Sequence, residues 1–138
     1  MRNVLGVIVG LIVGMIVNMA LVLLNVMLFP MPEGMDMNDP EQFNAYLAPL
    51  PDHAFLLPVA AHLGQAFAGG WVAAKIGSSR PVLLAMIIGV LSLAGGVVNL
   101  MTLTEAPTWM WIEVPLYLVV AWCAGKRVAR SREGQAAA

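Results

Sequence analysis

The sequence predicts an all-α integral membrane protein: a four-helix transmembrane bundle with both termini on the cytoplasmic side (N-in/C-in). Three observations predict it, namely the composition, the long apolar stretches and the distribution of charged residues. Of the 138 residues, 60% are hydrophobic and 11% are charged, and the mean hydropathy is +0.83. Because a soluble domain usually carries about 25% charged residues, this chain has too few to cover a water-exposed surface. Its length indicates a single membrane domain over residues 1–138.

Four stretches are long and apolar enough to cross about 30 Å of hydrocarbon, a distance that takes roughly 20 helical residues. The first is longer than the apolar core of a signal peptide, and no small-residue cleavage site follows it, so we expect it to be retained. The expected spans are 4–29, 54–76, 82–103 and 109–125.

The segment 30–53 is the largest part outside these spans. Asn38-Asp39-Pro40-Glu41 is typical of a helix start, with a capping side chain, a proline in the first turn and an acid near the positive end of the dipole. We therefore expect a short amphipathic helix over about 40–48, lying on the membrane surface or capping the mouth of the bundle. Its apolar side would consist of Phe43, Tyr46 and Leu47.

The charges predict the orientation. The segment 30–53 contains acidic residues and no Lys or Arg, whereas all seven basic residues flank the other ends of the spans. By the positive-inside rule, both termini, the turn between the second and third spans and the basic tail 126–138 face the cytoplasm. We therefore expect the protein in the plasma (inner) membrane. The basic residues are Arg2, Lys75, Arg80, Lys126, Arg127, Arg130 and Arg132.

The two halves of the chain contain residues of the same type at matching spacings. Gly14 and Asn18 in the first span have the same spacing as Gly95 and Asn99 in the third. His62 lies thirteen residues before Lys75, and Glu113 lies thirteen before Lys126. These matches fit either two tandem helical hairpins or coincidence in an apolar sequence.

Small residues recur at helical spacing in three of the spans. Lipid tails are as apolar as leucine, so membrane helices associate through close backbone packing and polar contacts. These faces predict either packing within one chain or, most plausibly through the first span, contact between chains. The candidate packing residues are Gly6, Gly10, Gly14, Gly69, Gly70, Ala73, Gly77, Gly89 and Gly96.

Polar residues in the spans are the candidate site. Polar groups in hydrocarbon are costly and usually face the bundle interior or a wet cavity. Nearly all of them lie in the outer half of the expected spans, which predicts a polar vestibule that is lined by five of these residues and opens outward, with His62 and Glu113 as a proton-accepting or cation-attracting pair. Alternatively, the amides form hydrogen bonds between helices, and Glu113 meets interfacial water behind Trp109 and Trp111. The five residues are Asn18, His62, Gln65, Asn99 and Glu113.

Motifs of hydrolytic, redox and phosphate-binding enzymes are absent from the sequence. A lone cysteine, Cys123, excludes an internal disulfide, and the methionines of segment 27–37 are ordinary apolar filler more often than copper ligands. We therefore expect no catalytic residue, no metal site and no cofactor. The short basic tail does not indicate nucleic-acid binding.

Two functions fit the sequence from different classes. The leading expectation is a transporter or channel for a small solute or ion, which works in the lipid bilayer as a homo-oligomer or in a larger membrane complex. The alternative is a non-catalytic accessory subunit of such a complex. A membrane enzyme that acts on lipid or quinone is a third, since His and Glu can perform acid–base chemistry.

Overall fold

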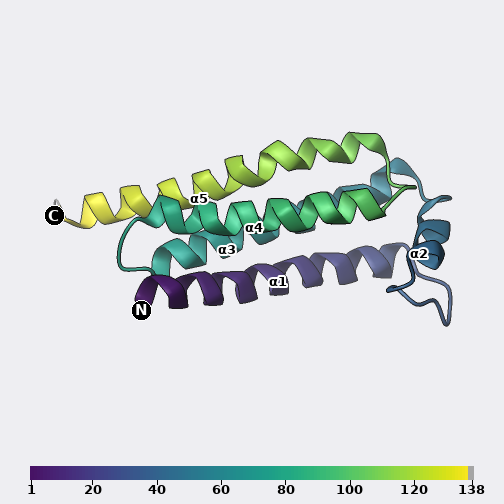
Figure 1. Ribbon diagram of the computed structural model, residues 1–138, viewed down its shortest axis with the longest axis horizontal. Coiled ribbons are helices and arrows are strands. Elements are labelled where there is room, and N and C mark those ends of the chain that lie inside the picture. Colours follow the sequence, from purple (N-terminus) through teal and green to yellow (C-terminus); the bar gives the residue numbers. More distant parts are fainter. Residues whose placement is uncertain (137–138) are drawn as a thin grey trace.

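The structure is a computed structural model that describes residues 1–136 (Figure 1). Within these residues it contains α-helices, short 3-10 turns and loops, without β-strands. The expectation of an all-α chain with four helices long and apolar enough to cross a membrane is confirmed for this part of the chain. In order, the elements are α1 (Arg2–Leu28), α2 (Pro40–Leu47), η1 (Asp52–Phe55), α3 (Leu56–Ile76), α4 (Pro81–Thr102), η2 (Thr108–Ile112) and α5 (Glu113–Ala136).

The four long helices run side by side, with both termini at one end of the bundle and α2 at the other (Figure 1). We call these the terminal end and the α2 end. Helix α3 is central, because it packs against α1, α4 and α5. Helices α4 and α5 also pack against each other, whereas α1 contacts α4 only lightly. The result is one hairpin, α1 with α3, beside a second hairpin, α4 with α5.

Helices α1 and α3 meet at glycines. The buried residues of α1 are Gly6, Gly10 and Gly14. An ideal Cβ on Gly10 would lie 2.5 Å from the carbonyl oxygen of Gly69, and a Cβ on Gly69 would lie 2.7 Å from that of Gly10. The two backbones thus touch at this crossing, with no room for a side chain on either glycine.

The distribution of side chains across α1 is the reverse of that in a soluble protein. The face toward α3 carries the small residues, while most of the large apolar side chains of α1 are exposed. Those exposed by half or more are Val4, Leu5, Ile8, Ile12, Met15, Ile16, Met19, Leu23, Met27 and Leu28.

The other long helices also approach closely in the terminal half. A Cβ on Gly89 of α4 would lie 2.5 Å from the Cβ of Ala121 in α5, and a Cβ on Gly125 would lie 2.7 Å from the Cα of Val82. Ala74, Ala85 and Val128 are buried together nearby. This half of the bundle is filled by small side chains.

Polar contacts close the terminal end. The Asn3 side-chain oxygen accepts a hydrogen bond from the backbone N–H of Ser78 at 2.8 Å, and its amide nitrogen donates to Ser79 Oγ at 3.0 Å. Arg132 donates to the carbonyl oxygens of Ala74 at 2.7 Å and of Gly77, at the last turn of α3. Helix α5 reaches this position because it does not stop where its apolar stretch ends at residue 125 but continues through the basic segment.

Helix α2 is fixed across the α2 end. Asp39 caps it by accepting from the backbone N–H of Glu41 and Gln42, and hydrogen bonds, first that of the Gln42 side chain, lower the pKa of the Asp39 carboxyl. Asn44 donates to the Thr102 carbonyl at 3.0 Å and accepts from the Glu105 N–H at 3.2 Å. The short helix therefore bridges toward the α4–η2 connection.

The inner side of α2 is apolar and faces the bundle. Leu47 belongs to a buried cluster with Phe55, Leu100 and Met110, against which Phe43 and Tyr46 pack. The Tyr46 hydroxyl donates to the Phe29 carbonyl at 2.6 Å, and burial raises the pKa of this phenol. Tyr46 thus acts as a neutral donor that holds α2 to the end of α1.

Candidate functional site

A histidine and a glutamate from different helices meet inside the bundle. His62 lies in the second turn of α3, and Glu113 begins α5, where a carboxylate is favoured by the helix dipole. His62 Nδ1 lies 3.1 Å from Glu113 Oε1 and 3.0 Å from Oε2. The Glu113 side chain is 0% exposed and that of His62 is 17% exposed. Glu113 is therefore enclosed by protein.

Tyr117 completes the cluster, and sequence reasoning missed it. It follows Glu113 by four residues, so both side chains lie on one face of α5. The Tyr117 hydroxyl donates to Glu113 Oε1 at 3.1 Å, and its ring stacks with that of His62 at 6.4 Å between centroids. A Cβ on Gly96 would collide with the Tyr117 ring, so Gly96 makes the space that this side chain occupies. The i, i+4 spacing was the available sequence signal.

The cluster supplies what a buried carboxylate requires. An unpaired carboxylate in a protein interior is costly, whereas one that accepts hydrogen bonds is tolerated. An ionised carboxylate can only accept hydrogen bonds, so when Glu113 is ionised both His62 Nδ1 and the Tyr117 hydroxyl donate to it. The second ring nitrogen of His62, Nε2, is not engaged by Glu113. This nitrogen can therefore form a hydrogen bond with another partner.

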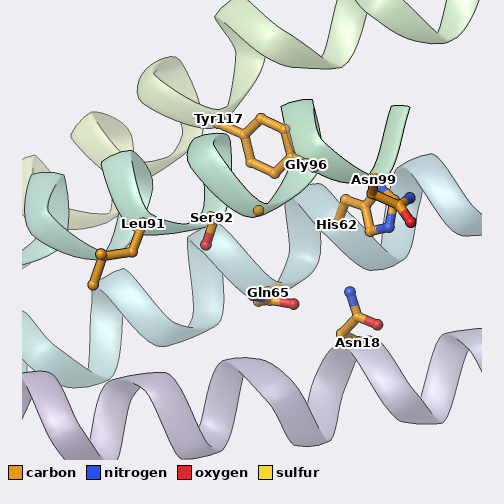
Figure 2. Close-up of a pocket in the computed structure, with 9 residues that line it drawn as sticks. Asn18, His62, Gln65, Leu91, Ser92, Gly96, Asn99 and Tyr117 are labelled. Atoms are coloured by element: carbon orange, nitrogen blue, oxygen red, sulfur yellow. The ribbon is translucent and has the colours of Figure 1, made fainter. Parts of the chain in front are cut away.

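A polar cavity of about 220 Å³ adjoins this cluster (Figure 2). Every long helix contributes to its wall. Four of the five residues predicted from the sequence line it, and the fifth, Glu113, lies behind His62 and Tyr117. The lining residues are Asn18, His62, Gln65, Leu91, Ser92, Gly95, Gly96, Asn99 and Tyr117.

The next feature concerns the hydrogen bonding of the polar side chains that line this cavity. Within residues 1–136, the side-chain amides of Asn18, Gln65 and Asn99 form no hydrogen bond with another part of the chain. The Ser92 hydroxyl is buried and also has no partner in this part of the chain, and Figure 2 shows it pointing toward the space between α3 and α4. A polar space of this size can hold water or a polar ligand.

A second cavity, of about 280 Å³, lies between the first and α2. The two adjoin, because Asn18, His62 and Asn99 line both. Its wall is largely apolar, and Phe43, Tyr46 and Leu47 of α2 form its roof. Met19, Val22, Asn25, Val26, Met31, Met37, Phe55, Pro58, Leu103 and Met110 supply the rest.

The positions with matching spacings in the two halves of the sequence also lie close to each other in the structure. Asn18 and Asn99 line the same two cavities, and His62 and Glu113 contact each other. A further match escaped the sequence reading: Trp71 precedes Lys75 by four residues, and Trp122 precedes Lys126 by four. In each case the lysine ammonium lies over the indole ring, at 5.6 and 5.5 Å. The tandem duplication itself stays a prediction.

Across residues 1–136, the structure brings together no group of three or more His, Cys, Asp or Glu side chains that could hold a metal ion. Comparisons of this chain with family models, with curated proteins and with solved structures found no match.

Proposed function

We propose that the protein is a proton-linked transporter of the inner membrane, which takes up a small solute or ion in the polar cavity and acts as a homo-oligomer. The observation that carries this proposal is the His62–Glu113 pair beside the polar cavity. A titratable pair that borders a cavity of uncommitted hydrogen-bonding groups couples ligand binding to proton binding. The proton resides on His62, and Glu113 and Tyr117 hold the imidazole in place.

Two structural features support membrane insertion. Large apolar side chains cover the outward face of α1, while its buried residues are glycines, which is the arrangement expected where lipid is the solvent. The two Trp–Lys pairs lie near the terminal end of α3 and α5. Tryptophan rings and long basic side chains are typical of the boundary between lipid and water.

Charge distribution supports the orientation. The α2 end contains the acidic segment 30–53, and the basic residues flank the terminal end. We therefore assign the α2 end to the outer side and both termini to the cytoplasm. In this orientation the two adjoining cavities lie toward the outer side, and the glycine- and alanine-packed half faces the cytoplasm.

A transport cycle requires that the packed half open. The two hairpins meet mainly through α3, which packs against both α4 and α5, and we place the movement at this boundary. The hairpin of α1 and α3 would rock against that of α4 and α5, and the His62–Glu113 contact would join the two. A change of protonation at this contact would then bias the two arrangements, as a switch must.

Proton flux into proteoliposomes tests the proposal. Vesicles that contain the protein and an internal pH-sensitive dye are given a potassium diffusion potential with valinomycin. We expect faster acidification than in protein-free vesicles, and loss of the excess rate in His62→Ala and Glu113→Gln. Glu105→Gln, a change at an exposed acid of the α2 end, serves as the matched control and should keep the wild-type rate. A wild-type rate equal to that of protein-free vesicles would contradict the proposal.

A further inference from the structure

Two adjoining cavities of opposite chemistry lie one behind the other along the bundle. The inner one is lined by amides, a hydroxyl and an imidazole, and the outer one by methionine, valine and aromatic side chains. Ligand sites commonly occupy 300–1,000 Å³. Neither cavity alone reaches that range, but the two together fall within it. Their shared wall of Asn18, His62 and Asn99 makes one elongated space with a polar and an apolar half.

Unsatisfied groups indicate that the polar half is built for a ligand. Ser92 is only 6% exposed, and its hydroxyl lacks a hydrogen-bond partner in the described part of the chain. A buried polar group without a partner costs roughly 1–3 kcal/mol, so such groups are rare unless water or a ligand pairs with them. Asn25 Oδ1, from a residue that lines the apolar half, is likewise buried without a partner among residues 1–136.

The residues that line the two cavities also determine which charge a bound molecule can carry. Among the described residues that line either cavity there is no lysine or arginine, because the basic residues flank the terminal end. An anionic group placed here would lose its hydration without gaining a permanent counter-charge. A cationic group would find the one carboxylate, Glu113, fully buried and already bound by His62 and Tyr117. The lining therefore favours a neutral hydrogen-bonding group.

The outer half accepts an apolar body of variable shape. Met19, Met31, Met37 and Met110 line it, and methionine side chains adapt to irregular apolar surfaces. Phe43 and Tyr46 of α2 cover it from the α2 end. A purely polar solute would leave this half without a matching partner.

We propose that the two cavities form one binding site for a compact neutral amphiphile, with a hydroxyl or carbonyl head in the polar cavity and an aromatic or branched apolar body beneath α2. This inference rests on the proposed function and names the substrate class of the same site. The head hydrogen-bonds with Ser92, Asn99 and the Nε2 nitrogen of His62. The body packs against the methionines and against Phe43.

Photolabelling with a matched pair of probes tests this proposal. The neutral probe is 4-(trifluoromethyl-diazirinyl)benzyl alcohol, and the anionic probe is the corresponding benzoic acid, which differs only in its head. Both carry the reactive diazirine on the apolar end. With the protein in lipid vesicles at pH 7.5, we expect the alcohol to label residues of the apolar cavity such as Met19, Phe43 and Met110. The benzoate should label them at less than a tenth of that level.

Three variants make the result specific. Val22→Trp fills the apolar cavity and should reduce this labelling about tenfold, whereas Leu23→Trp, on the exposed face of the same helix, should leave it unchanged. If Val22→Trp does not fold, as judged by circular dichroism, then Asn99→Leu, which removes a head-group partner, should lower the labelling instead. Equal labelling by both probes, or labelling that no cavity variant reduces, would overturn the proposal.

The outcome is distinct from that of the flux experiment. Labelling without proton flux would support the binding site and reject the transporter. Proton flux with no labelling of the cavity would reject the neutral amphiphile as the substrate class and leave the proton-linked transporter in place.

Discussion

His62 Nδ1 lies 3.0 Å from Glu113 Oε2, although the two residues are 51 positions apart in the chain and belong to different hairpins. The contact joins α3 of the first hairpin to α5 of the second. Because Glu113 is buried, the pair contributes to stability as well as to the proposed proton chemistry.

Removal of the Glu113 carboxylate should destabilise the bundle. In Glu113→Ala, the donors of His62 and Tyr117 lose their shared acceptor, and removal of one partner from a buried pair costs roughly 3–5 kcal/mol. Glu113→Gln keeps an acceptor oxygen and should cost less. Unfolding in detergent, followed by circular dichroism, measures the difference. Glu105→Ala, at an exposed site, is the control; an equal loss in both alanine variants would argue against a structural role for the pair.

The close approach of α1 and α3 predicts a strong effect of one methyl group. In Gly10→Ala, the new Cβ would lie 2.5 Å from the Gly69 carbonyl oxygen and 2.9 Å from the Ala73 Cβ. Overpacking of this kind typically costs about 1–3 kcal/mol, and we expect a lower unfolding midpoint. Gly95→Ala is the matched control, because a Cβ there meets nothing within 4 Å. If the two variants unfold alike, the glycine crossing does not hold these helices together.

Arg132 should secure the end of α3. Its guanidinium donates to three carbonyl oxygens near the α3 terminus, and hydrogen bonds from charged donors contribute about 1.5–3 kcal/mol. Arg132→Ala should therefore increase hydrogen exchange in the last turn of α3 and in the 77–80 turn. Arg130→Ala removes an exposed charge and should leave that exchange unchanged. No difference between the two variants would show that these contacts do not hold the turn.

Helix α2 should depend on pH through its cap. Hydrogen bonds lower the pKa of Asp39 from its ordinary value of 3.8. A lowered folded-state pKa means that the capping contribution is complete above that ordinary value and is lost as the pH falls through the lower folded value. Loss of α2 structure should therefore begin only below about pH 4, as observed through the Tyr46 ring signals by NMR. Asp39→Ala should show the loosened helix at neutral pH as well. Acidification that leaves the wild-type signals unchanged down to pH 2 would contradict this role of the cap.

The assigned orientation predicts which sites a membrane-impermeant thiol reagent reaches from outside intact cells. In a Cys123→Ala background, a cysteine at Gly34 should react, whereas one at Ser131 should react only after the membrane is permeabilised. The reverse pattern would place the α2 end in the cytoplasm.

Much of the architecture can be predicted from the sequence, because the patterns that mark each helix lie within its own stretch of the chain. The four long apolar runs and the capping residues Asp39 and Pro40 mark helices without reference to tertiary contacts. The few polar residues within the apolar runs similarly single out His62 and Glu113, because an apolar chain offers few alternatives.

The remaining features depend on packing in three dimensions. Tyr117 belongs to the cluster because Gly96 leaves room for its ring, and nothing in its own neighbourhood of the sequence indicates that space. The Ser92 hydroxyl, which has no partner within residues 1–136, and the two-part cavity likewise depend on side chains that several helices bring together. Arg132 reaches the end of α3 only because α5 extends beyond its apolar stretch.

A double-mutant cycle in the flux assay tests most directly the claim that His62 and Glu113 form one proton-handling unit. Rates are measured for the wild type, His62→Ala, Glu113→Gln and the double variant, all reconstituted at equal density. Residues that act as a unit give strongly non-additive losses, so we predict that the double variant is no slower than the slower single variant. Losses that multiply, or single variants that keep the wild-type rate, would contradict the account.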